Sequence, residues 1–217
     1  MPSCSSMGSK RAYGEKKVGN RDFFSIFAKK NNKMELLDRP AMIKMLEERM
    51  QYLYEKGNAD VQRLDKELER TPDDVEMWFE SGLARNQSGL QYLDMAFEKA
   101  RLMYMEEHLD TEEEPDRLTV EAPQAFDMFS AALRAFDKVL ELSPDYYGVQ
   151  CQRGVALANM QRYEEAEQCY LKALEEDEED FTAASYLSMV YRDMGKDDLA
   201  DKYMKLSEEL NGREELE

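Results

Sequence analysis

The second half of the chain repeats one spacing of small and large residues. In each copy a small residue is followed four positions later by a large one, and then by a third residue three positions further on. Steps of four and three keep side chains on one face of an α-helix, so each copy predicts a helix. The copies are 34 residues apart and comprise Ala132, Phe136 and Val139; Ala166, Tyr170 and Ala173; and Ala200, Met204 and Ser207.

A second helix is predicted before each of the last two copies. Gly154 and Ser188 lie 34 residues apart near the middle of these helices. Glycine costs about 1 kcal/mol inside a helix, so its presence there indicates close contact with a neighbouring helix. The segments 159–163 and 193–197 mark turns, and acidic residues follow them, as is favoured in the first turn of a helix. Residues 125–214 are therefore predicted to form helix pairs with a 34-residue period.

Similar landmarks occur further upstream. Proline followed by aspartate, which is typical of the end of one helix and the start of the next, occurs at Pro72 and again at Pro144. Gly82 follows Pro72 by ten residues, as Gly154 follows Pro144. The distance between the two sets is two periods plus four positions.

These landmarks resemble the tetratricopeptide repeat family, whose helix–turn–helix units of 34 residues carry small residues at fixed contacts. The resemblance is good over 125–214, partial over 59–88, poor over 89–124 and absent over 1–33. It implies an all-α fold, a right-handed α-solenoid of four to five such units. The implied units are about 41–74, 75–146, 147–180 and 181–214, with a basic and flexible tail at 1–33 and a C-terminal end at 215–217.

The first implied unit, 41–74, is the most degenerate. Glu48 and Asp60 stand where the other units have small residues. Two helices are still expected in it. Their apolar faces are formed by Met42, Met45, Leu46, Arg49 and Leu53, and by Val61, Leu64 and Leu68.

Residues 75–146 allow two interpretations. In one, they hold two units, of which the second has a first helix damaged by Pro115 and Pro123. In the other, they hold one unit that is interrupted by an insertion between a helix at 75–88 and a helix at 125–142. In both, Leu90, Leu93, Phe97, Ala100 and Met103 or Tyr104 form a helical stripe, and the acidic segment 106–116 is a loop.

Charge is distributed unevenly along the chain, whose net charge is −18. Residues 1–33 contain eight basic and two acidic residues, a net charge of +6, which leaves −24 for residues 34–217. A body this acidic repels nucleic acid and anionic lipid, so DNA binding is not expected. Contact with RNA or a membrane is expected only through the tail, if at all. The chain has no apolar run long enough to span a bilayer, and a cytoplasmic location is expected.

The sequence offers little catalytic or metal-binding chemistry. Its three cysteines have no metal-like spacing, and His108 is the only histidine. It has no phosphate-binding glycine loop and no recognisable nucleophile–base pair. We therefore expect no enzyme activity, no cofactor and no metal site. At 42% apolar residues, the chain can nevertheless bury a core.

The resemblance places a partner-binding groove on the first helix of each unit. Apolar residues and amides would line it, and amides can both donate to and accept from the backbone of an extended segment. The expected partner is another protein, and the function that follows is a scaffold or adaptor, as an assembly factor or complex subunit. The expected groove residues are Phe79, Leu83, Asn86, Gln87, Cys151, Val155, Asn159, Ser185, Met189 and Arg192. They include no lysine, so binding of acidic chaperone tails, as in some relatives, is not expected.

The basic tail has one distinctive segment at 22–30. Large apolar residues precede two lysines there, which suits docking on a partner or on the first repeat, or insertion at an anionic membrane surface. The tail also loosely resembles an organelle transit peptide, which gives an alternative location. An alternative function follows, in which the tail tethers the solenoid to RNA or an anionic membrane. The expected docking residues are Phe23, Phe24, Ile26, Phe27, Lys29 and Lys30.

The last predicted helix, 197–210, carries more apolar residues than its own unit needs. A solenoid end that is not capped exposes the face on which a further helix would pack. We therefore expect either a homodimer through this helix or a partner helix bound to it. The residues concerned are Leu199, Tyr203, Leu206 and Leu210.

Overall fold

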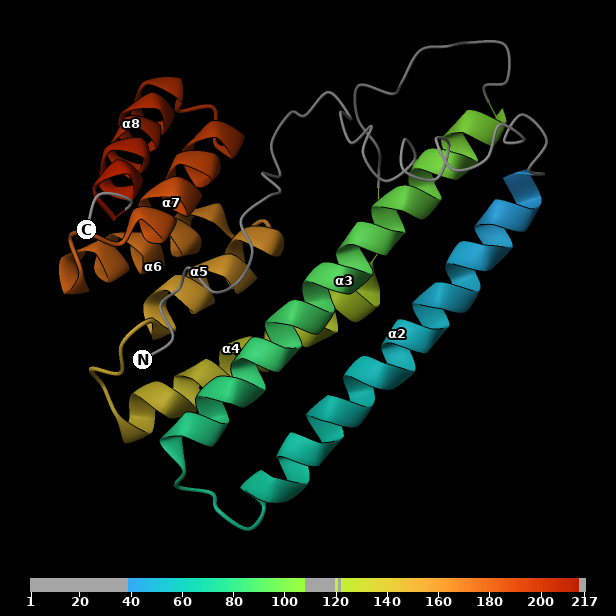
Figure 1. Ribbon diagram of the computed structural model, residues 1–217, viewed down its shortest axis with the longest axis horizontal. Helices are drawn as coiled ribbons and strands as arrows, with labels where there is room; N and C mark the ends of the chain where they lie inside the picture. Colours follow the sequence, from blue (N-terminus) through green and yellow to red (C-terminus); the bar gives the residue numbers. More distant parts are fainter. Residues whose placement is uncertain (1–38, 108–119, 121, 215–217) are drawn as a thin grey trace.

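The computed structural model describes residues 39–107, 120 and 122–214, and every regular element within these ranges is an α-helix. The tail residues Phe23, Phe24, Ile26, Phe27, Lys29 and Lys30 lie outside them. The helices are labelled as in Figure 1. They are α2 (Arg39–Leu68), α3 (Val75–Glu107), α4 (Pro123–Leu142), α5 (Val149–Asn159), α6 (Tyr163–Glu176), α7 (Phe181–Asp193) and α8 (Asp197–Glu214).

Consecutive helices pack side by side in chain order (Figure 1). α2, α3 and α4 form a group of long helices, and α5 to α8 form a group of shorter ones. The helices α3, α5 and α7 also contact one another in sequence. This nearest-neighbour stacking is typical of a helical solenoid and confirms the predicted fold class. Among the described helices, none is both long and apolar enough to cross a membrane.

The repeated small–large stripe lies in the core, as its spacing predicts. Phe136 and Tyr170 are 0% and 1% exposed, and the small residues around them are equally buried. Glycine permits the close approach of the paired helix, because a Cβ atom at Gly154 would lie 2.6 Å from the Tyr170 ring and one at Gly82 would overlap the Phe136 ring. In the last pair Ser188 takes this position, and its hydroxyl donates to the carbonyl oxygen of Ala200 at 2.8 Å.

The expectation of two helices within 41–74 is wrong. One helix, α2, runs without a break from Arg39 to Leu68. The one glycine in this helix, Gly57, is insufficient to end it, and no proline lies near Gly57. α2 lies along α3 at least from Glu47 to Asp65. Glu47 near one end pairs with Lys99 at 2.7 Å, and Asp65 near the other end pairs with Arg85 at 2.5 Å.

In the described part of 75–146, α3 and α4 form a helix pair whose first helix is lengthened. α3 does not end near residue 88 but continues to Glu107, so the apolar stripe from Leu90 onward belongs to the same helix. Pro123 lies in the first turn of α4, where proline is tolerated, instead of damaging a helix. A second glycine–aromatic contact, between Gly89 and Phe129, holds the extended part of α3 against α4. The continuous helix α3 stands where the interpretation with two units expects a helix pair, and it favours a single unit lengthened within α3. Most of the segment expected to hold the damaged helix of a second unit lies outside the described residues.

Candidate partner-binding face

The inner helices α3, α5 and α7 lie next to one another and carry the residues expected to bind a partner. The structure does not leave all of these residues accessible. They fall into three groups: residues buried between helices, residues that complete a core cluster, and residues that face solvent at least in part.

Asn86, Cys151 and Val155 are buried, with exposed fractions of 1%, 0% and 8%. The amide nitrogen of Asn86 donates to the backbone oxygen of Gln152 at 3.0 Å, which joins α3 to α5. Cys151 and Val155 belong to the cluster that α5 shares with α6 and α7. These three side chains hold helices together and are not accessible to a partner.

Phe79 and Leu83 are half-buried and pack on the core between α3 and α4. The Phe79 ring lies 6.0 Å from the Phe136 ring and 5.1 Å from the Tyr146 ring. These contacts fix the loop that leads into α5. At this end of the inner face the expected apolar floor is therefore already occupied by the protein's own side chains.

The expected groove residues that remain accessible lie mainly on α5 and α7. Asn159, Ser185 and Met189 are partly exposed, and Gln87 and Arg192 are exposed. The Asn159 amide nitrogen donates to the Val155 carbonyl oxygen at 2.8 Å within its own helix. The Arg192 side chain is 44% exposed and lies 3.9 Å from the Asp201 carboxylate, which is a loose pair. This arrangement can offer an amide, a hydroxyl, a thioether and a cation to a ligand.

Asp193 of α7 adds a titrating group at the same edge. It occupies the position in α7 that Asn159 occupies in α5, one period earlier. Burial raises the pKa of the Asp193 carboxyl to about 6, and Arg192 opposes this shift. Its place in the last turn of a helix is also unfavourable for a carboxylate. The period could have drawn attention to this exchange of an amide for an acid.

The structure also has a polar junction that sequence reasoning missed. Glu167 of α6 accepts a hydrogen bond from the Tyr191 hydroxyl at 2.9 Å and one from the Lys196 ammonium at 3.2 Å. Together with burial, the bond to Glu167 raises the pKa of the Tyr191 hydroxyl. The spacing of these residues follows no local motif, because the bonds join positions 24 and 29 residues apart.

Comparison with known families agrees with the geometry of α5 and α6. Residues 149–180 match the model of the tetratricopeptide repeat. The matched residues contain the Gly154–Tyr170 contact and both helices of the pair. The match confirms the resemblance that the repeat spacing indicated.

Similar solved structures are those of the protein MamA. One is 17% identical, covers 74% of this chain and 92% of its own, and has a TM-score of 0.42. A second, MamA 41-end from Desulfovibrio magneticus RS-1, is 12% identical, with coverage of 79% and 96% and a TM-score of 0.39. A third, MamA MSR-1, is 21% identical, with coverage of 76% and 98% and a TM-score of 0.38. No curated protein sequence matches the chain.

Proposed function

We propose that the protein is a non-catalytic scaffold or adaptor that holds a segment of a partner protein against the inner face of α5 and α7, as an assembly factor or a subunit of a complex. The observation that carries this proposal is the row of partly exposed side chains on two adjacent inner helices. The tetratricopeptide repeat at 149–180 supports a role in protein interaction, because solenoids of this kind bind through their concave face.

The accessible residues suit an extended peptide segment. Asn159 can bond its backbone, Met189 offers a flexible apolar contact, and Arg192 can pair with a carboxylate. The core around them is complete, so binding requires no rearrangement of the buried residues. Within the described ranges, no group of histidine, cysteine or acidic side chains is placed to hold a metal ion.

Substitution of two residues on this face by glutamate tests the proposal. The variant Asn159→Glu with Met189→Glu should lose the proteins that the full chain captures from a native lysate, because carboxylates would be forced against the bound segment. The control variant, Gln124→Glu with Gln168→Glu, adds the same charge at exposed positions on α4 and α6 and should retain them. Circular dichroism checks that both variants are folded. Unchanged capture by the first variant would refute the groove.

A second candidate function is a tether whose tail binds RNA or an anionic membrane. The net charge of +6 on residues 1–33, against −24 on the rest, favours it. Such binding should weaken by orders of magnitude as salt rises from about 50 to about 200 mM. A variant that begins at Met34 should lose it completely. Binding that persists in this variant, or that is insensitive to salt, would exclude the tether.

A further inference from the structure

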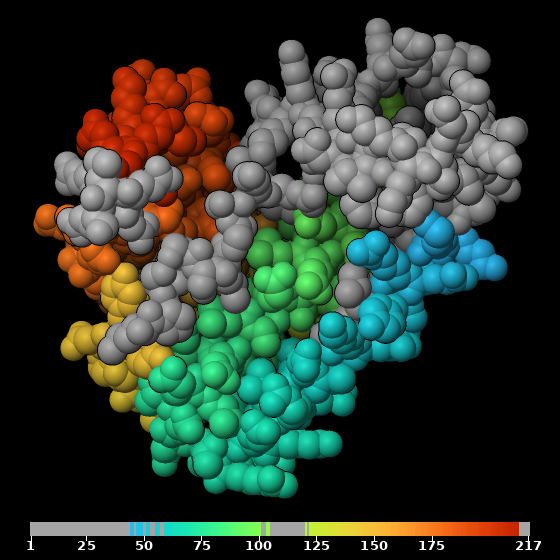
Figure 2. Space-filling model, viewed as in Figure 1, coloured from blue at the N-terminus to red at the C-terminus, as the bar shows by residue number. Residues whose placement is uncertain are grey.

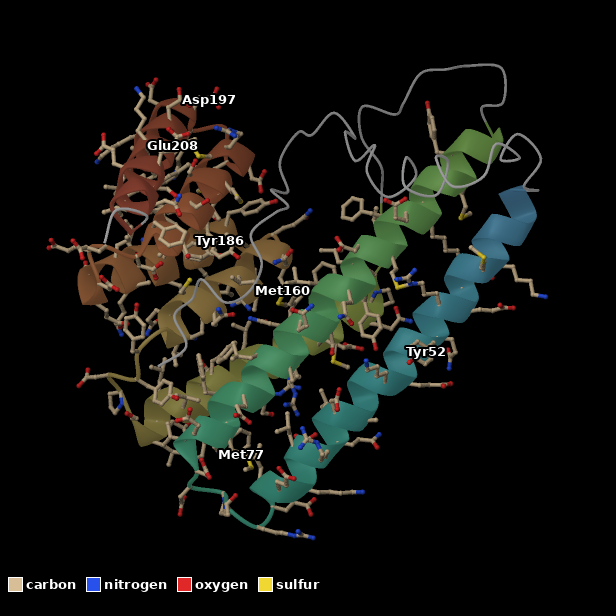
Figure 3. All side chains as sticks on the ribbon, in the orientation of Figure 1. Tyr52, Met77, Met160, Tyr186, Asp197 and Glu208 are labelled. Atoms are coloured by element: carbon tan, nitrogen blue, oxygen red, sulfur yellow. The ribbon has the colours of Figure 1, made fainter. Side chains whose placement is uncertain are left out.

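The junction of α6 with α7 shows how one helix pair receives the next. Ala183 and Leu187 of α7 share a buried cluster with Cys169 and Tyr170 of α6. The rings of Tyr170 and Tyr186 lie 5.7 Å apart across this junction, where Figure 3 labels Tyr186. The surface by which α5 and α6 receive α7 is therefore apolar and almost completely buried.

Each position of this receiving surface has a counterpart on α7 or α8, 34 residues later in the sequence. The four receiving positions of the α5–α6 pair, Cys151, Val155, Cys169 and Tyr170, are between 0% and 8% exposed. Their four counterparts on α7 and α8 are all partly exposed. In the described part of the chain, α8 packs mainly against α7, and it lies at one edge of the molecule (Figure 2). The positions Cys151, Val155, Cys169 and Tyr170 correspond to Ser185, Met189, Tyr203 and Met204.

The polar part of the junction has an open counterpart as well. Glu167 on α6 accepts hydrogen bonds from Tyr191 and Lys196 of the following pair. Its counterpart on α8 is Asp201, whose side chain is 73% exposed and 3.9 Å from the nearest Arg192 nitrogen. An acid is thus retained at the position where the previous pair binds a phenol and an ammonium group.

We propose that the α7–α8 end is a docking site for an amphipathic helix of another protein, which occupies the place that α7 occupies on α5 and α6. The partner helix carries small and aliphatic residues at the spacing of Ala183, Leu187 and Val190. It also carries a tyrosine at the spacing of Tyr191, and a lysine in the turn that follows the helix, as Lys196 does after α7, and these meet Asp201. This site shares Ser185 and Met189 with the peptide groove but extends over α8 to Tyr203, Met204 and Asp201, and it goes beyond the function proposed above.

Two observations favour this occupant. The end continues an interface that the chain forms twice, since α5 packs on the α3–α4 pair and α7 on the α5–α6 pair. In addition, residues 197–210 contain five acidic residues and two lysines, so the surface selects a partner of basic character. Figure 3 labels two of these acids, Asp197 and Glu208, on α8.

A peptide with the sequence of residues 180–196 serves as the probe, because this sequence already fits the equivalent surface. It is labelled with a fluorophore and held helical by a lactam bridge between positions 185 and 189. Fluorescence anisotropy with the full chain should give saturable binding. The variant Asp201→Lys should weaken binding about 5-fold or more, since it replaces an attraction of roughly 1 kcal/mol by a repulsion.

The matched control is Asp198→Lys, which makes the same charge change on the same helix. Its counterpart on α6, Glu164, is exposed, so this variant should bind the peptide as the unchanged chain does. A peptide with glutamate in place of its final lysine should bind Asp201→Lys better than the unchanged chain. The variant Asn159→Glu, which alters only the groove, should leave peptide binding unchanged, so the two proposals can fail separately.

Hydrogen exchange locates the bound peptide. Binding should slow exchange in α7 and α8 and leave α2 unaffected. The proposal is overturned if the peptide does not bind, if Asp201→Lys and Asp198→Lys behave alike, or if protection appears elsewhere. It is also overturned if light scattering shows a dimer that Asp201→Lys dissociates, because the occupant is then a second copy of the chain.

Discussion

The α3–α4 pair and the α5–α6 pair use the same contact at two different lengths. In both, a glycine in the first helix faces an aromatic ring in the second, Gly82 against Phe136 and Gly154 against Tyr170. The two members of the second pair lie within one repeat period, whereas those of the first pair are separated by more than one period. The longer pair repeats the contact at Gly89 and Phe129, two helical turns away along each helix.

The comparison separates two determinants of a repeat. The glycine–ring contact sets how closely the helices approach, whereas local stop signals set where each helix ends. α5 ends at Asn159. Two residues later, Gln161 adopts a positive φ of 60°, which turns the chain. α3 meets a glycine at the corresponding distance, Gly89, but this glycine packs against Phe129 inside the helix. The helix therefore continues to Glu107.

Adding a methyl group at the shared contact should have the largest effect. In Gly82→Ala and Gly154→Ala the new Cβ meets a buried ring, and overpacking costs about 1–3 kcal/mol. The better helix propensity of alanine offsets about 1 kcal/mol of this. Urea denaturation should show a net loss of up to about 2 kcal/mol in each pair. Gly212→Ala, whose Cβ meets nothing within 4 Å, is the control and should not destabilise. A loss in only one pair would mean that the two contacts are not equivalent.

The turns that end α5 and α7 should respond in opposite directions to exchange of their residues. Gln161 and Gly195 occupy corresponding positions in successive repeats and have φ values of 60° and 71°. A side chain in this region costs about 1 kcal/mol. We expect Gln161→Gly to raise the free energy of unfolding by only about 0.5 kcal/mol, because glycine also gains freedom in the unfolded chain. Gly195→Gln should lower it by about 1 kcal/mol. Equal effects of the same sign would contradict the shared turn geometry.

Asp193 should produce the smallest effect, visible as a pH dependence that Asn159 lacks. Its pKa of about 6 in the folded chain exceeds the ordinary value of 3.8, so its stabilising contribution is complete below about pH 4 and is lost as pH rises through 6. The stability of Asp193→Asn relative to the unchanged chain should therefore rise between pH 4 and pH 7. Urea denaturation of both proteins at several pH values measures this difference. Because Asp193 is only half-buried, a gain on the order of 1 kcal/mol or less is expected. A difference that does not change with pH would contradict the raised pKa.

How much the sequence predicts differs between the two halves of the chain. The helices and turns from α5 to α8 follow from residues at a constant spacing, because each contact lies within one repeat unit. The pairing of Gly82 with Phe136 has no such local signal, since the intervening residues lengthen α3. The prediction for α2 was wrong because its two apolar stripes were assigned to separate helices, although both lie on one continuous helix.

The sequence predicted which helices carry the candidate face, but not which of its residues are exposed. The family resemblance placed Asn159, Met189 and Arg192 on the inner helices, and in the structure they are at least partly exposed. It could not show that Asn86 is buried, because its partner is the backbone of Gln152, 66 residues away. Nor could it show the bonds of Glu167, whose partners belong to the following helix pair. Contacts between units depend on how the units stack, which the spacing within a unit does not specify.

Among the described helices, α2 packs mainly on α3, and this has a consequence for how the fold unfolds. In a linear stack, stability is a sum of each unit and its interfaces with adjacent units. Internal helices lie between two others, whereas α2 packs mainly on α3. Release of α2 therefore breaks mainly one interface and leaves the glycine–ring contacts of the α3–α4 and α5–α6 pairs in place. The chain can open from this side in a partial step, while α5 to α8 continue to present both candidate binding surfaces.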